Sequence, residues 1–322
     1  MRSALLHTLV PAAVLAACSV VHAAPVSLGV AGDYNLVSLG DLKATSDVEG
    51  ALAVGGDMEV SGYAVNANHR AVDGNALVVG GNLTFHNGSI QNGNAWVGGT
   101  RDLASFGFNG AWATGQAPIS FEQIAADMQA LSQGLALVPV TGSSTLQWGG
   151  IQLTGTQAAT EVFGLSAADL QATNWGSLSN AAADATLILN ISGAHVKFSG
   201  GFPNVLSNYN VLYNFFEATT LEFSGIGIYG SVLAPWATVE GGSGQINGNV
   251  IVAAWNSGIQ VNANRYFQDA ELPGYTPPAA GQPLAEEPNQ VPEPGSFVLV
   301  AAALAALAWQ RRSPRASRRI AF

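Results

Sequence analysis

Short apolar segments that end in paired glycines recur along the middle of the chain. Residues 51–58 (ALAVGGDM) return as residues 76–83 (ALVVGGNL), an offset of 25 positions. Further along, residues 228–234 (IYGSVLA) are matched by residues 246–253 (INGNVIVA), an offset of 18 positions. The chain therefore repeats a short unit with β-strand composition.

Repeats at such periods are typical of a solenoid, in which each coil buries its apolar face on its neighbours. Looser copies at residues 39–42 and 95–99 extend the series. Glycine and asparagine at the corners suit left-handed turns. A β-sandwich would give turn signals about every 8–12 residues, and the doubled spacing here favours the solenoid. We therefore expect a mainly β fold, a parallel β-helix (solenoid) with one helix packed alongside.

One segment has a helical period instead. Within residues 118–137, Ser120 stands three positions before Gln123, which is the spacing of a capping box. Apolar residues follow every three or four positions, at Phe121, Ile124, Met128, Leu131 and Leu135. We expect a helix whose apolar stripe packs along the side of the β-helix. A second, shorter helix is expected where Ser166 precedes Asp169.

The first 24 residues read as a secretory signal peptide: a basic start, an apolar run, then small residues. Cleavage is expected after Ala23, in the context Val21-His22-Ala23. A second interpretation stays open, because residues 15–18 (LAAC) resemble a lipobox in which Cys18 would be acylated. Under the first interpretation the mature chain has no cysteine, which excludes disulfides, thiolate metal sites and cysteine nucleophiles.

The other end has three parts in a fixed order. A spacer over residues 273–294 holds 7 of the 14 prolines, a composition typical of an extended linker. The motif Val291-Pro292-Glu293-Pro294 then leads into an apolar run over residues 297–309, and an arginine cluster follows. The run is short for a spanning helix, and by the positive-inside rule the arginines would stay cytoplasmic.

Motif, short hydrophobic helix and arginine cluster together resemble the PEP-CTERM sorting tail of Gram-negative bacteria. The resemblance implies recognition and removal of the tail by a membrane-embedded exosortase. We expect a signal peptide over residues 1–23, a body over 24–270, a proline-rich spacer over 271–290 and a sorting tail with a short transmembrane helix over 291–322. A plain tail anchor stays open as an alternative.

Charge is unevenly distributed. If both ends are removed, only five basic residues face the acidic ones, leaving a net charge of roughly −16; these are Lys43, Arg70, Arg101, Lys197 and Arg265. A body so acidic repels phosphate backbones, so nucleic acid is not an expected partner. With only 10% charged residues and 38 glycines, the chain is neither a coiled coil nor a charge-rich disordered protein.

The repeat-bearing segments also carry a family resemblance. Residues 33–41 (DYNLVSLGD) and 46–56 (SDVEGALAVGG) look like the opening of the choice-of-anchor A domain. Residues 212–218, 230–235 and 246–251 are similar to its close. The resemblance covers about residues 26–270 and implies a surface protein, adhesin-like, whose anchoring device varies. It supplies no catalytic residues.

Candidate chemistry is sparse. Three histidines remain in the mature chain, His69, His86 and His195, with no metal-ligand or nucleophile motif around them. Six acidic residues are dense enough to supply the paired carboxylates of a glycoside hydrolase or oxygen ligands for Ca²⁺; these are Asp33, Asp41, Asp47, Glu49, Asp57 and Glu59. A solvated acidic face that keeps a secreted protein soluble is the favoured explanation over a calcium site. We expect no catalytic, cofactor or metal residues, with Ca²⁺ as a weak alternative.

Tryptophans bear on a binding role. Six lie in the body: Trp96, Trp112, Trp148, Trp175, Trp236 and Trp255. Trp236 and Trp255 stand 19 positions apart, near equivalent coil positions. Stacked aromatic rings on one face could bind sugar rings, and an internal stack filling the core stays open.

These observations predict a secreted, non-enzymatic surface or matrix protein that acts as an adhesin or scaffold. Expected partners are an exosortase, exopolysaccharide or another surface component, and the inner membrane transiently. The expected location is the cell surface or extracellular matrix of a Gram-negative bacterium. Two alternatives remain: a carbohydrate-active hydrolase with paired carboxylates, and an ice-binding protein. Ice binding needs a regular threonine ladder, for which Thr154-Gly155-Thr156 is thin support.

Overall fold

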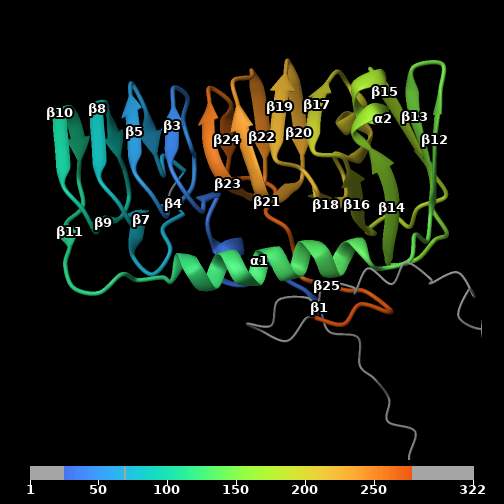
Figure 1. Cartoon of the computed structure of the whole chain (residues 1–322), viewed down its shortest axis with the longest axis horizontal. Coiled ribbons are helices and arrows are strands. Elements are labelled where there is room, and N and C mark those ends of the chain that lie inside the picture. The colour runs from blue at the N-terminus through green and yellow to red at the C-terminus, as the bar shows by residue number, and fades with distance from the viewer. Residues whose placement is uncertain (1–24, 69, 278–322) are drawn as a thin grey trace, which may run out of the picture. The chain divides into compact units, whose positions relative to one another are not determined.

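The computed structural model describes residues 25–277 except His69. Parallel strands form two long ladders and a shorter third one, and a helix, α1 (Phe121–Ala136), runs along one of the long ladders (Figure 1). This confirms the expectation of a mainly β fold with parallel strands and one long helix.

The first ladder faces α1 and is parallel throughout. In spatial order it contains β14 (Thr160–Ser166), β16 (Thr186–Ser192), β18 (Asn210–Asn214), the first part of β21 (Ser231–Glu240), the first part of β23 (Val250–Ser257), β2 (Leu36–Ser38), β4 (Leu52–Val54), β7 (Asn75–Val79), β9 (Asn94–Val97) and β11 (Trp112–Ala113). Its central strands are buried on both faces, because one face packs into the core and the other against α1 and the first and last segments of the body, whereas β9 and β11 are mostly half-buried.

The second ladder has one buried and one exposed face, so its side chains alternate in burial. It contains β17 (His195–Ser199), β19 (Thr220–Ser224), the second parts of β21 and β23, β3 (Leu42–Ala44), β5 (Met58–Ser61), β8 (Leu83–Ile90) and β10 (Arg101–Phe108). This ladder presents an exposed sheet face that crosses eight strands.

The third ladder is shorter. It contains β20 (Ile226–Tyr229), β22 (Gly244–Asn247) and β24 (Gln260–Asn262), and Val48 bridges it to β6 (Ala64–Val65). A separate end sheet is formed by β12 (Ser143–Gln147), β13 (Gly150–Thr154) and β15 (Trp175–Ser179), with β12 antiparallel to β13. The remaining elements are β1 (Pro25–Val26), which pairs with β25 (Ala270–Glu271), and the short helices η1 (Gly29–Asp33), α2 (Ala167–Ala172) and η2 (Phe202–Leu206).

The sequence repeats correspond to paired strands. Leu52 pairs with Leu77, which is the offset of 25, and Val232 pairs with Val250, which is the offset of 18. The looser copies also pair, since Leu42 lies against Met58. The offset of each sequence repeat is therefore the register at which the corresponding strands pair.

The order of strands does not follow the chain. β2 lies between β4 and β23, so Leu36 pairs with both Leu52 and Val250. The described chain enters the first ladder in its middle, at β2, and runs outward to β11. It then passes along α1 to β14 and returns to the middle (Figure 1).

Glycine pairs mark the corner between the first and second ladders. A Cβ on Gly80 would lie 2.3 Å from the carbonyl oxygen of Gly55, and one on Gly98 would lie 2.4 Å from that of Gly80. These glycines have ordinary φ values, so close backbone contact, not a left-handed turn, requires them. Left-handed corners do occur elsewhere at asparagine, for example at Asn66 and Asn92.

Both predicted helices are present. Ser120 caps α1 by accepting a hydrogen bond from the Gln123 amide, but the Gln123 side chain donates to Asp127, so the predicted capping box is only half formed. Ser166 and Asp169 form a complete box at α2. The stripe of α1 is buried against the first ladder at Ile124, Met128, Leu131 and Leu135, with Phe121 half-buried.

Buried amides fix α1 to the first ladder. Asn190 donates to the Leu135 carbonyl, and Asn214 donates to the Ser132 carbonyl while accepting from the Ser132 hydroxyl. Asn214 also donates to Asn190 at 2.8 Å. These directional contacts hold the helix in one axial position, which apolar packing alone does not specify.

Candidate binding surfaces

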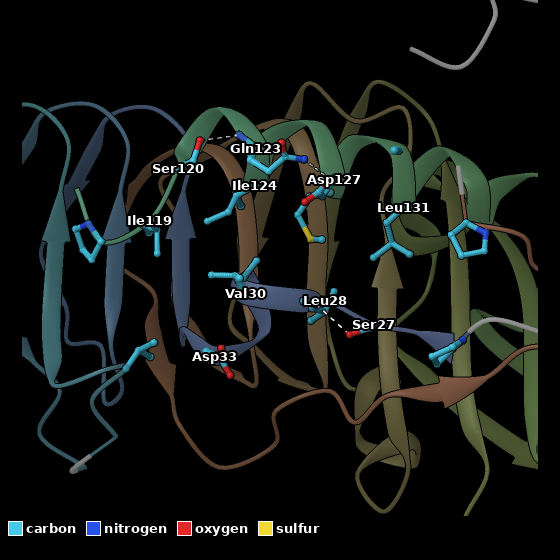
Figure 2. A pocket seen from close by; sticks show the side chains of 18 of the residues that line it. Ser27, Leu28, Val30, Asp33, Ile119, Ser120, Gln123, Ile124, Asp127 and Leu131 are labelled. Atoms are coloured by element: carbon cyan, nitrogen blue, oxygen red, sulfur yellow. Dashed lines mark hydrogen bonds between the residues drawn. The ribbon is translucent and has the colours of Figure 1, made fainter. Parts of the chain in front are cut away.

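A groove of about 580 Å³ separates α1 from the N-terminal segment. Figure 2 shows Ile124 and Leu131 of α1 across from Val30 and Leu28. Three carboxylates add polarity to its apolar lining, those of Asp33, Asp73 and Asp127. The groove offers apolar contact beside negative charge, and Pro25 and Pro277, where the described chain begins and ends, also line it.

A row of polar and charged side chains crosses the exposed face of the second ladder. One residue from each strand contributes to this charged row, and the register lines them up in the order Asp102, Thr84, Glu59, Lys43, Asn256, Glu240, Glu222 and Lys197. Lys43 lies 2.8 Å from Glu59, and Lys197 lies 2.9 Å from Glu222. Hydrogen bonding to Glu59 raises the pKa of Lys43. Exposed ion pairs contribute little to stability. The charged row is therefore of interest as a surface for binding and not as a source of stability.

The six acidic residues singled out from the sequence do not gather into one site. Asp41 accepts a hydrogen bond from the Asp57 amide, and Asp57 accepts from the Asn82 amide, so each carboxylate binds the backbone beside the neighbouring strand of the ladder. Asp47 accepts from the Ala64 amide and Glu49 from the Ala263 amide. Glu59 belongs to the charged row, and Asp33 lines the groove. Four of these six carboxylates therefore accept hydrogen bonds from backbone amides.

Among the residues that the structure describes, no group of three His, Cys, Asp or Glu side chains is arranged to hold a metal ion. His86 and His195 lie on the strands β8 and β17. The Nε2 atom of His86 is 3.4 Å from Asp102, without hydrogen-bond geometry. His69 lies outside the described residues.

The tryptophans differ widely in exposure. Trp255 is 2% exposed and belongs to the core. The expected equivalence of Trp236 and Trp255 is wrong, because the register of β21 with β23 shifts between Ala234 and Thr238 and Trp255 pairs with Val239 instead. Trp148 and Trp175, by contrast, are 83% and 38% exposed.

A buried carboxylate, Glu161, was missed by the sequence reasoning. It is fully buried on β14, where it accepts hydrogen bonds from the Thr156 and Ala158 amides and from the Thr141 hydroxyl. Burial works to raise its pKa, but these hydrogen bonds outweigh burial and hold the pKa below its usual value. The available signal was a lone acid at the start of the apolar strand 160–165.

A Glu161→Gln variant is expected to lose about 2 kcal/mol of stability at pH 7, because an amide cannot accept from all of these donors. Since the folded-state pKa is lowered, the contribution of Glu161 is complete above its unfolded-state pKa of about 4.3. It is lost as the pH falls through the folded-state pKa. Urea unfolding of both proteins from pH 7 to pH 3 should show the difference shrink below about pH 4.3. A difference independent of pH would contradict this assignment.

The predicted terminal features lie outside the described residues. These are the cleavage site at Ala23, Cys18, the motif Val291-Pro292-Glu293-Pro294 and the apolar run 297–309. Within the described part of the chain, no helix combines the length and apolarity needed to cross a membrane. The short transmembrane helix therefore stays a prediction.

The family of the chain follows from a comparison with models of known protein families. A model described as "Putative Ice-binding-like adhesive domain" matches residues 27–263, which is most of the chain. The chain belongs to this ice-binding-like adhesive family. A model of the PEP-CTERM protein-sorting motif matches residues 290–312 and confirms that resemblance. This member of the adhesive family is thus an exported protein that an exosortase sorts to the cell surface, as in Gram-negative bacteria.

One solved structure is similar, an ice binding protein from an Antarctic Biological Consortium. It shares 13% identity at a TM-score of 0.30, covering 82% of this chain and 97% of that chain. A likeness this distant carries no argument about function. No curated protein matches the chain.

Proposed function

We propose that this adhesive-family protein is a non-enzymatic adhesin or scaffold that binds extracellular polysaccharide at the cell surface or in the matrix. The sorting motif supports the location, and the family supports an adhesive role. We further propose that the ladders wind as a parallel β-helix, that the body resembles the choice-of-anchor A domain, and that the tail anchors the chain transiently in the inner membrane.

The observation that carries the proposal is the charged row. The row crosses an exposed sheet face, and it mixes Lys, Glu, Asp and Asn side chains with one threonine instead of the regular threonine ladder that ice binding needs. Thr154 and Thr156 do not supply one either. Thr154 lies on β13, whereas Thr156 lies in a loop bound to Glu161. These features favour adhesion over ice binding.

The carboxylates also favour a non-enzymatic role. A glycoside hydrolase needs two carboxyl groups about 5–10 Å apart across the scissile bond, with one protonated at working pH. Asp41, Asp57 and Asp47 instead accept backbone hydrogen bonds, and Glu161 is enclosed by its donors. The hydrolase alternative therefore has little support.

Co-sedimentation tests the proposal. Purified residues 24–290 are mixed with the producing organism's exopolysaccharide, with and without calcium, and the pelleted protein is measured. We expect saturable pelleting. No pelleting under either condition contradicts polysaccharide binding and favours a protein partner or an enzyme.

The same co-sedimentation with a chelator added tests the alternative in which calcium is bound. If pelleting is lost in chelator, the double variant Glu222→Gln, Glu240→Gln tests whether these neighbouring carboxylates of the charged row hold the ion. A matched control is Glu122→Gln, at the start of α1 and away from the row. Thermal hysteresis of the same preparation tests ice binding, and release of reducing sugar tests the hydrolase alternative.

A further inference from the structure

The end sheet of β12, β13 and β15 has an exposed face with an unusual composition. Register and burial place three ranks of side chains on it: Ser143, Thr154 and Ser179; Thr145, Gln152 and Ser177; and Gln147, Gly150 and Trp175. We call this set the hydroxyl face. None of the three strands contains a charged residue, although the body as a whole is strongly acidic.

An indole ring covers one end of this face. A Cβ on Gly150 would lie 2.0 Å from the ring of Trp175, so this ring rests directly on the Gly150 backbone. The Trp175 Nε1 atom donates to the Trp148 carbonyl at 3.3 Å, which satisfies its polar group within the protein. The opposite side of the ring remains available, since Trp175 is 38% exposed.

Trp148 lies at the tip of the β12–β13 hairpin in a conformation that suits it poorly. Gln147 pairs with Gly150, and the two residues between them, Trp148 and Gly149, have φ values of 50° and 73°. Such two-residue turns favour Asn-Gly, because asparagine tolerates the left-handed region and a bulky side chain does not. Trp148 is also 83% exposed. Neither conformation nor burial accounts for a tryptophan here, which points to a binding role.

We propose that Trp148, Trp175 and the hydroxyl face form a binding site for a neutral polysaccharide chain. A pyranose ring has a face of C–H groups, which stacks on the negative face of an indole, and a rim of hydroxyls. Ser, Thr and Gln side chains both donate and accept hydrogen bonds, as sugar hydroxyls require. The absence of charge means that no ion has to be desolvated when a neutral chain binds. This inference rests on the proposed function and assigns its contact surface.

A second copy of the chain fits this surface less well. Two indoles contribute about 150–250 Å² each, whereas a stable interface buries about 800 Å² on each partner. Leu137 and Val140, also exposed, precede β12 and so lie at its other end from Trp148. The apolar area near the tip is therefore small, which suits a sugar chain stacking on individual rings.

The test uses the whole chain, purified in mild detergent and run in native gels cast with dextran, hydroxyethylcellulose or alginate. We expect retardation by at least one neutral glucan, dextran or hydroxyethylcellulose, and none by the acidic alginate. Trp148→Asn should weaken binding by about tenfold, the loss that corresponds to one stacked ring. Because asparagine suits the turn, this variant should unfold at the same or a higher urea concentration. Thr145→Val tests the hydroxyl contacts without a change of shape.

Leu137→Gln is the matched control, since it removes an exposed apolar side chain that lies away from Trp148, before the start of β12, and should leave retardation unchanged. The assignment is overturned if neither glucan retards the chain or if Trp148→Asn is retarded equally. It is also overturned if light scattering shows a dimer that this variant dissociates. If the wild-type chain and Trp148→Asn both pellet with exopolysaccharide, the proposed function stands and this site fails. If the wild-type chain does not pellet, the glucan gels still decide the site.

Discussion

The Asn249→Leu variant is expected to lose about 4 kcal/mol of stability, since the carbonyls of Gly32 and Tyr34 each lose a hydrogen-bond donor at a cost of about 1–3 kcal/mol. The Asn249 side chain donates to the carbonyls of Gly32 and Tyr34 at 2.8 and 2.7 Å and accepts from the Phe267 amide at 2.8 Å. It thus connects the beginning and the end of the body to the ladder between them. Leucine has a similar size, so the loss reflects hydrogen bonding and not a cavity.

Urea unfolding followed by circular dichroism measures the effect. Asn256→Leu is the control, because Asn256 is exposed on the charged row and donates only to Glu240. Its stability should change by no more than about 0.5 kcal/mol. Equal losses in the two variants would show that the Asn249 contacts do not hold the two chain segments together.

Gly80→Ala is the second variant with a large expected effect. The new Cβ would lie 2.3 Å from the Gly55 carbonyl oxygen and 3.1 Å from its carbonyl carbon, both backbone atoms that cannot rotate away. Relief requires the backbones at Gly55 and Gly80 to move apart, and we expect a loss of about 3 kcal/mol of stability. Gly55 and Gly98 lie on either side of Gly80 at the same corner, so a shift at Gly80 would also displace their backbones.

Gly107→Ala provides the comparison. Gly107 lies in β10 with its nearest contacts at 3.6 and 3.7 Å and no positive φ. Alanine should therefore change stability by no more than about 0.5 kcal/mol, with any gain coming from reduced freedom of the unfolded chain. If thermal unfolding shows both variants equally affected, the close approach of neighbouring backbones is not the reason for the glycine pairs.

Local features were predictable because they depend on neighbouring residues. The repeat offsets appear as strand registers, and Ser120 and Ser166 cap the two helices. The position of β2 between β4 and β23 was not predictable, because the pairing of Leu36 with Val250 leaves no periodic trace. The equivalence of Trp236 and Trp255 failed for a related reason, since a bulge changes the offset within one strand.

The binding surface was only partly predictable. The sequence presented six tryptophans without ranking them, and the pair chosen for its spacing was not the exposed one. Backbone conformation distinguishes Trp148, since its positive φ follows from a two-residue turn between β12 and β13. A Gln-Trp-Gly-Gly run between polar strands was the available signal, but aromatic residues are not expected in such turns.

The placement of β2 in the middle of the ladder has a kinetic consequence. Its partner Val250 lies 214 positions further along the chain than Leu36, so this edge of the first half stays unpaired until nearly all of the body is available. Closing so long a loop is slow compared with local pairing. Until then the open edge can pair with another chain. A chain that stops before residue 250 should therefore aggregate, and holding the polypeptide unfolded until it is complete would protect it.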